Sequence, residues 1–564
     1  MPLFALSVKI DNMSENKTKT NNSFVRQAAI LGATGILARL LGFLYRLPLT
    51  DLIGDDGNGI YAVGFSVYAF LLVLSSAGLP SAISKMVAER AALGHFDAAH
   101  GVFRVAFRLA ATIGVVVSVI VFFLAEQITG MLLMPQATLA LQMLTPTIFI
   151  VALMSVIRGY FQGMDTTAPT ALSQLVEQIF NAIFSVVLAH AMWNFAMDRG
   201  YELANFGAAG GALGSTVGAF VGFIFITGLY FLRRKDILRK VSRARVSRQI
   251  KLGNRYQEEK TSRLVRSILR TSFTIIAGTA VFSIATLIDV WLVPSRLLVA
   301  GFDNQTATEF LGQVAGKFNT ITNVPAAISS SIAIATIPAI AAARKLGNKQ
   351  DVQEKLNVAF RVGMLLTIPI AFGLAVLGPQ IVALLFPNHP EGGTLFHWGF
   401  LSVIFLAASQ ISTGVLQALN FGRVPVFSAI CGAIVKIVVG FILISMPNIN
   451  IYGAVIGTTL CFLVSSVINC LFLFKYTNTN PDIRGMLIKP AFASIAMGIG
   501  CFGFYHLLYI LFRQPTFATI VTIVIGMVLY VVFMLLVGGL NHQDILFLPG
   551  GSRLLAKMKG KGLI

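Results

Sequence analysis

Fourteen apolar runs of membrane-spanning length follow one another along the chain, and they leave little room for any other kind of fold. A helix needs about 20 apolar residues to cross the hydrocarbon core of a bilayer. Only 12% of the 564 residues are charged, whereas a soluble domain carries about 25%. We therefore predict an all-α, polytopic membrane protein whose 14 transmembrane helices lie near residues 24–48, 59–80, 103–125, 137–160, 169–193, 205–232, 268–295, 319–342, 357–386, 395–419, 426–446, 452–475, 487–511 and 516–538.

An internal repeat relates the two halves of the sequence. The residues Val-Ala-Phe-Arg at 105–108 recur at 358–361, and Leu-Gly at 93–94 recurs at 346–347, both 253 residues further on. Duplicated halves are typical of membrane transporters. Six runs precede the midpoint, and because six is an even number both copies have the same orientation in the membrane. The pattern predicts two six-helix lobes related as parallel repeats, with helices 13 and 14 left over.

Basic residues indicate which ends of the helices face the cytoplasm. When the N-terminus is placed inside, the inner connections hold most of the Lys and Arg residues, and the outer loops at 51–56 and 387–393 hold none. Lys and Arg collect on the cytoplasmic side of membrane proteins. We therefore predict that both termini lie inside.

The connection between the sixth and seventh helices is strongly basic. Residues 233–270 hold 14 Lys or Arg and three acids, a balance of +11 within the net charge of +20. Such a segment favours contact with the anionic headgroups of the inner leaflet. A nucleic-acid site is not favoured, because Tyr256 is the only aromatic residue of the segment and no further residue could stack on bases.

These features divide the chain into six segments. Residues 1–23 do not form a cleavable signal peptide; we expect a disordered cytoplasmic N-terminus, with Met13 as a second candidate for the start. The other segments are the N-lobe at 24–232, the basic cytoplasmic linker at 233–267, the C-lobe at 268–475, helices 13 and 14 at 476–540, and a cytoplasmic C-terminus at 541–564.

Two arginines of the first helix are candidates for binding an anion. Arg39 and Arg46 are seven residues apart, which is two helical turns, so they share one face of the helix. Charges inside a membrane are costly and usually face a wet cavity, and the guanidinium fork suits phosphate. The alternative is that the long side chain reaches the membrane surface, which carries more weight for Arg46 than for the deeper Arg39.

Three further charged residues lie inside predicted helices. Glu177 in the fifth helix and Lys436 in the eleventh differ by three residues in repeat register, so they occupy similar faces of equivalent helices. They are candidates for lining a central space; the alternatives are a structural pair or two separate polar anchors. Asp289 in the seventh helix could serve a coupling cation or pair with Arg296, seven residues further on, and we favour the pair.

Prolines interrupt or bound several predicted helices and could act as bending points. Proline kinks a helix because it lacks the backbone N–H and clashes with the preceding turn. The hinge candidates are Pro80, Pro325 and Pro338. For each of them the alternative is a kink that the membrane helix merely tolerates.

The sequence does not favour an enzyme, a metal site or a nucleotide-driven pump. It has no P-loop, no Ser/His/Asp set and no His/Cys cluster with ligand spacing. The four cysteines, at 431, 461, 470 and 501, lie in apolar runs and fit small core residues better than a disulfide framework. We expect no cofactor, and either a coupling ion or the membrane potential as the driving force.

Three motifs resemble those of a known family. They are Ala-Arg-Leu-Leu-Gly-Phe at 38–43, Ala-Gly-Leu-Pro-Ser-Ala-Ile-Ser at 77–84, and Val-Pro-Ala-Ala at 324–327 running to Ile-Pro at 337–338. Together with the number of helices, they make the chain similar to the polysaccharide flippases of the multidrug/oligosaccharidyl-lipid/polysaccharide superfamily. Within it the chain resembles most the branch of Gram-positive lipid II flippases and their sporulation relatives.

The resemblance implies a V of two six-helix lobes around a central cationic cavity, in the plasma membrane of a bacterium. The cavity would take the diphosphate and sugars of an undecaprenyl-linked precursor, and helices 13 and 14 would form a groove for the lipid tail. Arg39 corresponds to the family's cavity arginine of the first helix, and Arg46 is displaced by one residue from the second. The family's arginine of the eighth helix falls near Thr320, with Lys317 one turn away.

The function implied by the resemblance is a flippase that works by alternating access, above all for the peptidoglycan precursor lipid II. The alternatives are an exporter of capsule or teichoic-type precursors, and a multidrug or organic-cation antiporter, which needs acids in its cavity. A scaffold or polymerase of wall synthesis would need catalytic acids or long outer loops. Expected partners are the lipid-linked oligosaccharide, anionic lipids at residues 233–270 and cell-wall synthesis proteins, for a chain that acts as a monomer.

Overall fold

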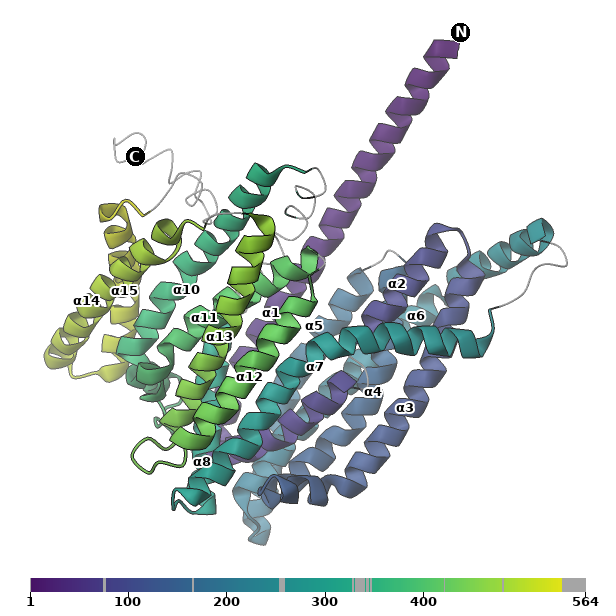
Figure 1. The fold of residues 1–564 in the computed structure, drawn as a ribbon. Coiled ribbons are helices and arrows are strands. Elements are labelled where there is room, and N and C mark those ends of the chain that lie inside the picture. The colour runs from purple at the N-terminus through teal and green to yellow at the C-terminus, as the bar shows by residue number, and fades with distance from the viewer. Residues whose placement is uncertain are drawn as a thin grey trace. The chain divides into compact units, whose positions relative to one another are not determined.

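The computed structural model describes residues 2–74, 78–164, 167–252, 259–326, 347–419, 421–478 and 481–539, with the single residues 329, 340 and 344. In this part of the chain every regular element is a helix (Figure 1). Ten of the described helices are long and apolar enough to cross a bilayer. The prediction of an all-α, polytopic membrane protein is confirmed, and the number of 14 spans stays a prediction.

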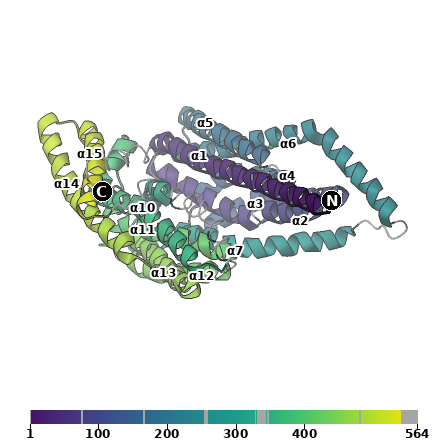
Figure 2. The same ribbon diagram turned by 90° about the horizontal axis from the view of Figure 1, so that it is seen from above.

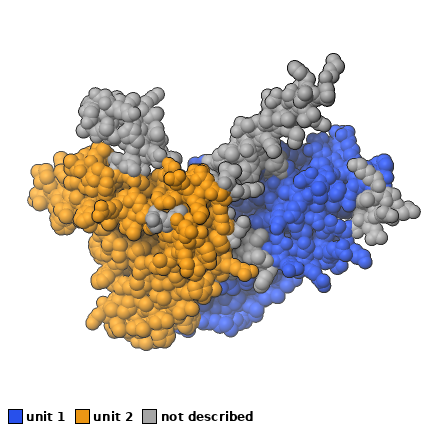
Figure 3. Space-filling view, turned by 45° about the horizontal axis from the view of Figure 1, so that its top comes forward, with its two compact units in different colours: residues 1–49, 63–287 blue, residues 50–62, 288–564 orange. Residues whose placement is uncertain are grey.

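The chain divides into two compact units, which Figure 3 colours separately. Unit 1 comprises residues 1–49 and 63–287, and unit 2 comprises residues 50–62 and 288–564. The short segment 50–62 therefore belongs to the unit formed by the second half of the chain. This division does not test the domain boundaries predicted from the sequence, which stay predictions.

Helix α1 (Pro2–Leu72) holds both of the first two predicted spans in one element. It is broken at Gly54, whose φ of +71° lies in the left-handed region that favours glycine. It also includes residues 2–23, for which the disordered cytoplasmic N-terminus stays a prediction.

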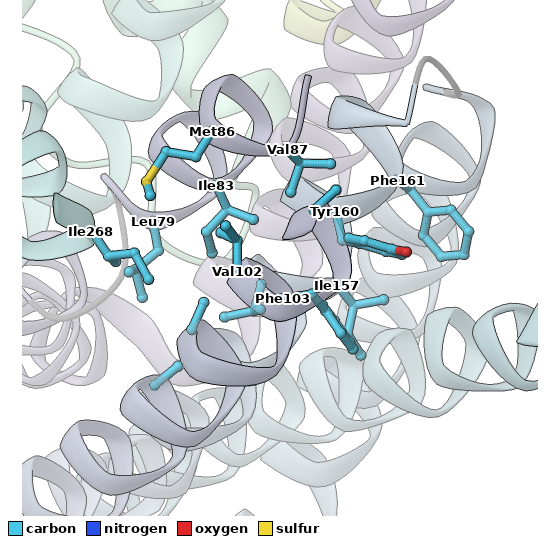
Figure 4. Close-up of a cluster of buried hydrophobic side chains, with 14 of the residues drawn as sticks. Leu79, Ile83, Met86, Val87, Val102, Phe103, Ile157, Tyr160, Phe161 and Ile268 are labelled. Carbon is cyan, nitrogen blue, oxygen red and sulfur yellow. The ribbon is translucent and has the colours of Figure 1, made fainter. Parts of the chain in front are cut away.

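Unit 1 is a bundle built on the centrally buried helix α4. Its other helices are α2 (Leu79–Ala92), α3 (Phe96–Met131), α4 (Thr138–Gly163), α5 (Ala168–Arg199), α6 (Leu203–Leu252) and the first part of α7 (Thr261–Val299). Helix α4 packs against α2, α3 and α6. The core where α2, α3 and α4 meet includes Ile83, Phe103 and Tyr160, and Ile268 of α7 closes it (Figure 4).

Helices α5 and α6 pack closely against each other. A glycine recurs at every fourth position of α6, and a Cβ atom on any of the four would touch the backbone or the Cβ atom of α5. Small residues let membrane helices come together at this distance. The glycines are Gly210, Gly214, Gly218 and Gly222, and they face α5 from Leu188 down to Glu177.

Unit 2 contains the remaining helices. They are α8 (Asn304–Gly312), the π-helix η4 (Gln313–Phe318), α10 (Lys349–Leu385), α11 (Leu395–Ala418), α12 (Arg423–Leu443), α13 (Tyr452–Thr477), the π-helix η5 (Arg484–Ile488), α14 (Lys489–Phe512) and α15 (Pro515–Leu536). Helices α10, α11 and α13 share a core around Phe360, Ile411 and Leu473. Helical residues also follow η4 as far as residue 326, and the rest of the predicted span 319–342 lies almost wholly outside the described residues.

Helices α14 and α15, the pair left over by the repeat, lie side by side against α10 (Figures 1 and 2). The hydroxyl of Tyr530 in α15 donates to the Leu365 carbonyl of α10 at 2.9 Å. Away from α10 the pair exposes large apolar side chains, among them Ile499, Ile510 and Leu536. A face of this kind suits contact with lipid.

The repeat extends from the sequence to the backbone. Gly94 and Gly347 both take left-handed φ angles, of +73° and +71°. Two residues later α3 begins at Phe96 and α10 begins at Lys349, again 253 positions apart. Both copies of the Leu-Gly pair thus form a turn with a left-handed glycine, and a long helix begins two residues after each glycine.

Candidate functional site

Lys436 and Asp289 form a buried ion pair in unit 2. The Nζ atom of Lys436 in α12 lies 2.6 Å from Oδ2 of Asp289 in α7, and the two side chains are 7% and 14% exposed. Gly440, one turn after Lys436, lets α12 pack directly onto Leu292 of α7. Two opposite charges at this distance offset part of the cost of removing each from water.

The pairing of Asp289 with Arg296, which we favoured from the sequence, is wrong. Seven residues along a helix correspond to a rise of about 10 Å, so the Arg296 guanidinium does not reach the carboxylate. It lies over the ring of Phe441 instead, 4.1 Å from the ring centre. The partner of Asp289 is Lys436, a residue that the sequence singled out for a different reason.

Glu177 of α5 has its own partner in unit 1. Its Oε2 atom lies 2.7 Å from Nη2 of Arg158 in α4, and Nε of the same arginine donates to the Ser173 hydroxyl at 2.9 Å. The side chains of Arg158 and Glu177 are 12% and 18% exposed. The glycine row of α6 packs against Glu177 through Gly222, so the carboxylate is held in place from two sides.

Lys317 is the most deeply enclosed of the candidate cations. It lies in η4 with no exposed surface, and its Nζ atom is 2.6 Å from Oδ1 of Asp55. It also donates to the backbone carbonyls of His389 at 2.7 Å and Glu391 at 3.0 Å. One ammonium group therefore joins three segments of unit 2: the stretch 50–62, η4, and the connection before α11.

The backbone around Asp55 is fixed by further polar contacts. Nδ2 of Asn58 donates to the Gly54 carbonyl at 2.7 Å, and the Thr50 hydroxyl donates to Asn58 Oδ1 at 3.1 Å. The carboxylate of Asp51 accepts from both the backbone N–H and the side-chain amide of Asn388, at 2.9 and 2.6 Å. The break at Gly54 and these bonds together direct Asp55 towards Lys317.

Glycines make the close approach around Lys317 possible. A Cβ atom at Gly312 would overlap the carbonyl of Asp55, and one at Gly59 would overlap the carbonyl of Thr308. At Gly316 an added Cβ atom would press on the side chain of Asn58. The Asp55 carboxyl lies between the predicted spans, and burial raises its pKa while the Lys317 ammonium opposes that rise.

The two arginines of α1 lie in unit 1. Arg39 is exposed and Arg46 is half-buried, and α1 is continuously helical between them. Of the hinge candidates, Pro80 lies in the first turn of α2, where a helix tolerates proline without a kink. Pro325 lies in the helical residues that follow η4, and Pro338 lies outside the described residues.

The structure thus pairs each internal candidate with a residue of opposite charge that the sequence had not paired with it. Glu177 and Lys436 belong to different units, and each has its partner in its own unit. The sequence had not singled out Arg158, and it had singled out the segment of Asp55 only as a loop without Lys or Arg. The signal in both cases was a charge in or beside an apolar run. No group of three or more His, Cys, Asp or Glu side chains in the described ranges could hold a metal ion.

Two family models match the chain. One, described as "Polysaccharide biosynthesis protein", matches residues 24–344, and one described as "MatE" matches residues 313–442. The chain is 27% identical to the stage V sporulation protein B of Bacillus subtilis, over 77% of this chain and 80% of that protein. It is 20% identical to the lipid II flippase MurJ of the same organism, over 85% of this chain and 88% of the relative.

A solved structure has the same fold. It is a lipid II flippase MurJ in an inward closed conformation, and the TM-score is 0.63 at 14% sequence identity. The match covers 90% of this chain and 98% of that one. At this identity the likeness shows the fold alone.

Proposed function

Because the chain belongs to the polysaccharide biosynthesis protein family, we propose that it is a flippase for a lipid-linked oligosaccharide. The substrate we infer is an undecaprenyl-diphosphate-linked oligosaccharide, above all lipid II, which moves from the inner to the outer leaflet of a bacterial plasma membrane. The observation that carries the proposal is the pair of arginines, Arg39 and Arg46, two turns apart on one continuous helix. Relatives named as a sporulation protein and a lipid II flippase support it.

The chemistry of a diphosphate headgroup suits this arrangement. A guanidinium group donates two parallel hydrogen bonds to phosphate oxygens, and such charge-assisted bonds are about twice as strong as neutral ones. Two guanidinium groups on one helix face can bind the two phosphates while the sugars extend away. In this proposal Arg39 and Arg46 bind the diphosphate, and the binding site is exposed to each leaflet in turn.

The internal ion pairs would supply the coupling. We infer that Asp289 exchanges its bond to Lys436 for a cation during the cycle, and that Lys436 and Lys317 add positive charge for the headgroup when released. Glu177 with Arg158 is a second internal ion pair, which joins α5 and α4 in unit 1. Pro325 and Pro338 stay hinge candidates, and both termini stay predicted to lie inside.

A multidrug or organic-cation antiporter is the second candidate, because the MatE model matches residues 313–442. Such a transporter needs carboxylates that attract a cation. Asp289 and Glu177 are the acids inside predicted membrane helices that could take this role. Each is already neutralised by a basic side chain at 2.6–2.7 Å. This pairing favours an anionic substrate over an organic cation.

The test is translocation of labelled lipid II by the purified chain reconstituted in vesicles. Arg39→Ala should lower the rate at least tenfold, because a hydrogen bond to a charged group contributes about 1.5–3 kcal/mol. Arg243→Ala, which removes an exposed arginine of α6, is the matched control and should leave the rate unchanged. Normal translocation by Arg39→Ala would contradict the assignment of this arginine.

A binding comparison identifies the substrate within the class. Lipid II, a capsule precursor and a teichoic-type precursor share the undecaprenyl diphosphate and differ in their sugars. We expect lipid II to bind most tightly to the purified chain. Tighter binding of another precursor would support the flippase function but change the proposed substrate. Binding of organic cations alone would favour the antiporter.

A further inference from the structure

Two neighbouring cavities of unit 1 share two arginines of α3. The first has a volume of about 180 Å³ and lies where the start of α3 meets the end of α6 and the start of α7. The second, of about 270 Å³, lies between α3, α4 and α6. Arg104 and Arg108, one helical turn apart, line both of them.

The first cavity has an excess of positive charge. Its charged side chains are four arginines and two carboxylates: Arg104, Arg108, Arg245, Arg248, Asp97 and Glu259. Both carboxylates are already bound, Asp97 to Arg248 at 2.9 Å and Glu259 to Arg90 at 2.7 Å. Arg104 and Arg108 are exposed and have no acidic partner within the described ranges. Their two guanidinium groups are therefore available to an anion.

The second cavity is apolar apart from the two arginines and Thr227. Its walls are aromatic and aliphatic side chains of three helices: Phe103, Phe107, Ile157, Tyr230 and Phe231. Phe103 and Ile157 also belong to the buried core of unit 1 (Figure 4), so this wall is firmly held. An anion site that adjoins an apolar cavity suits a molecule with a phosphate at one end and a hydrocarbon chain at the other.

The second copy of the repeat provides an internal comparison. A cavity of unit 2 is lined by the residues that stand 253 positions after Asp97, Ala98, Gly101, Arg104 and Arg108, namely Gln350, Asp351, Glu354, Asn357 and Arg361. Its charged residues are one arginine and three carboxylates, the third being Asp482. Arg361 lies 3.6 Å from that carboxylate and donates to the Gly539 carbonyl at 2.9 Å. The same place in the fold thus carries the opposite charge, and its arginine is occupied.

This contrast shows that the repeated fold does not require arginines without an acidic partner at the start of α3 or of its counterpart α10. Unit 2 folds with an arginine at this place, Arg361, whose charge the Asp482 carboxylate neutralises. Unpartnered guanidinium groups on a rigid helix cost free energy through mutual repulsion. Their presence in unit 1 alone, beside an apolar cavity, points to a ligand that neutralises them.

We propose that Arg104 and Arg108 bind the phosphate of an anionic phospholipid of the inner leaflet, with one acyl chain against Phe107 and Phe231. The predicted orientation places the start of α3 on the inner side, where anionic lipids collect. The site is separate from Arg39 and Arg46, and it is independent of the proposed substrate. It assigns a defined pocket to the contact with anionic lipid that the basic residues 233–270 suggested only in general.

The experiment measures phosphatidylglycerol bound to the purified full-length chain by native mass spectrometry, with phosphatidylcholine as the neutral lipid. Arg104→Gln/Arg108→Gln should weaken phosphatidylglycerol binding about tenfold or more, since each basic residue near a membrane surface contributes about a factor of five. Lys240→Gln/Arg243→Gln removes the same charge from exposed positions of α6 outside both cavities. This control should change the affinity less than twofold.

A second variant tests the apolar part without touching the charges. Phe231 is 57% exposed, so Phe231→Ala should fold normally, and it should weaken phosphatidylglycerol while leaving any binding of glycerol 3-phosphate unchanged. Wild-type affinity in Arg104→Gln/Arg108→Gln would overturn the proposal. So would competition by glycerol 3-phosphate as effective as that of the lipid, which would identify a site for a soluble phosphate. No outcome depends on transport, so failure here leaves the flippase proposal standing.

Discussion

Replacement of Lys317 by methionine tests the most enclosed of the ion pairs among the described residues. Methionine keeps the length of the side chain and removes the ammonium group. The change leaves the Asp55 carboxylate, 8% exposed, without a cation, and it leaves the carbonyls of His389 and Glu391 without their donor. Removal of one partner of a buried pair costs about 3–5 kcal/mol, so we expect a loss of that size for Lys317→Met.

The matched control is an ion pair of the same length at the surface. Lys355 and Asp351 are 2.7 Å apart on α10, with side chains 35% and 34% exposed. An exposed pair of this kind contributes about 0.2–1 kcal/mol. Lys355→Met therefore removes the same chemical group from a pair of nearly the same length, and the differences are the burial and the two carbonyl acceptors of Lys317.

The assay is the half-life of the folded protein in detergent at one elevated temperature, followed by the peak of the folded protein in gel filtration. A chain with two units need not unfold in one step, so a rate is the better-defined quantity. The half-life of Lys317→Met should fall at least tenfold, because about 1.4 kcal/mol acting on the unfolding barrier is enough. An unchanged half-life, or an equal loss in Lys355→Met, would refute the reasoning.

The pH dependence of the same variant gives an independent check. Burial raises the pKa of Asp55, and Lys317 is the main group that opposes the rise. Without Lys317 the folded state binds a proton on Asp55 more tightly than the unfolded chain, whose aspartate pKa is about 4. Lys317→Met should therefore gain stability as the pH falls through the folded-state pKa, and the gain should level off below about pH 4. Lys355→Met keeps Lys317, which limits the rise of the Asp55 pKa, so its gain at low pH should be smaller.

Two further predictions concern the packing and the second pair of unit 2. Gly312→Ala should shorten the half-life strongly, because its Cβ atom would overlap the Asp55 carbonyl, whereas Gly373→Ala, with nothing within 4 Å, should be close to neutral; equal effects in the two would contradict the packing argument. Asp289→Asn should leave Lys436 buried without a counter-charge and destabilise the protein by about 3–5 kcal/mol. The double variant Asp289→Leu/Lys436→Met should recover the stability but not the proposed translocation of lipid II, and recovery of both would make the pair purely structural.

Local sequence rules predicted the helices better than their ends. The run at 59–80 was expected to end at Pro80, but α1 ends at Leu72 and Pro80 lies in the first turn of α2, which begins at Leu79. Proline can close one helix or open the next, because its missing N–H is harmless in a first turn. The run at 103–125 gave the apolar middle of α3, which in fact extends from Phe96 to Met131. Polar turns at a membrane surface continue a helix without any apolar signal.

Charged residues inside apolar runs are easy to recognise in the sequence, and most of the candidate residues were identified in this way. The sequence named Glu177, Lys436 and Asp289, and the family resemblance added Lys317; all four are engaged in ion pairs. It did not give the partners. Asp55 lies 262 positions before Lys317, and nothing in local periodicity connects residues so far apart.

The sequence by itself determined that this protein is a helical membrane protein with a duplicated plan, since hydrophobic length and repeated motifs are properties of the chain. It also identified Arg39 and Arg46 as two charges on one face of the first helix. Only the tertiary structure decided which charges neutralise each other: Asp289 with Lys436, Glu177 with Arg158, Asp55 with Lys317. The physical reason is that an ion pair depends on a distance of a few ångströms in space, and helix packing sets that distance through glycines such as Gly222, Gly312 and Gly440.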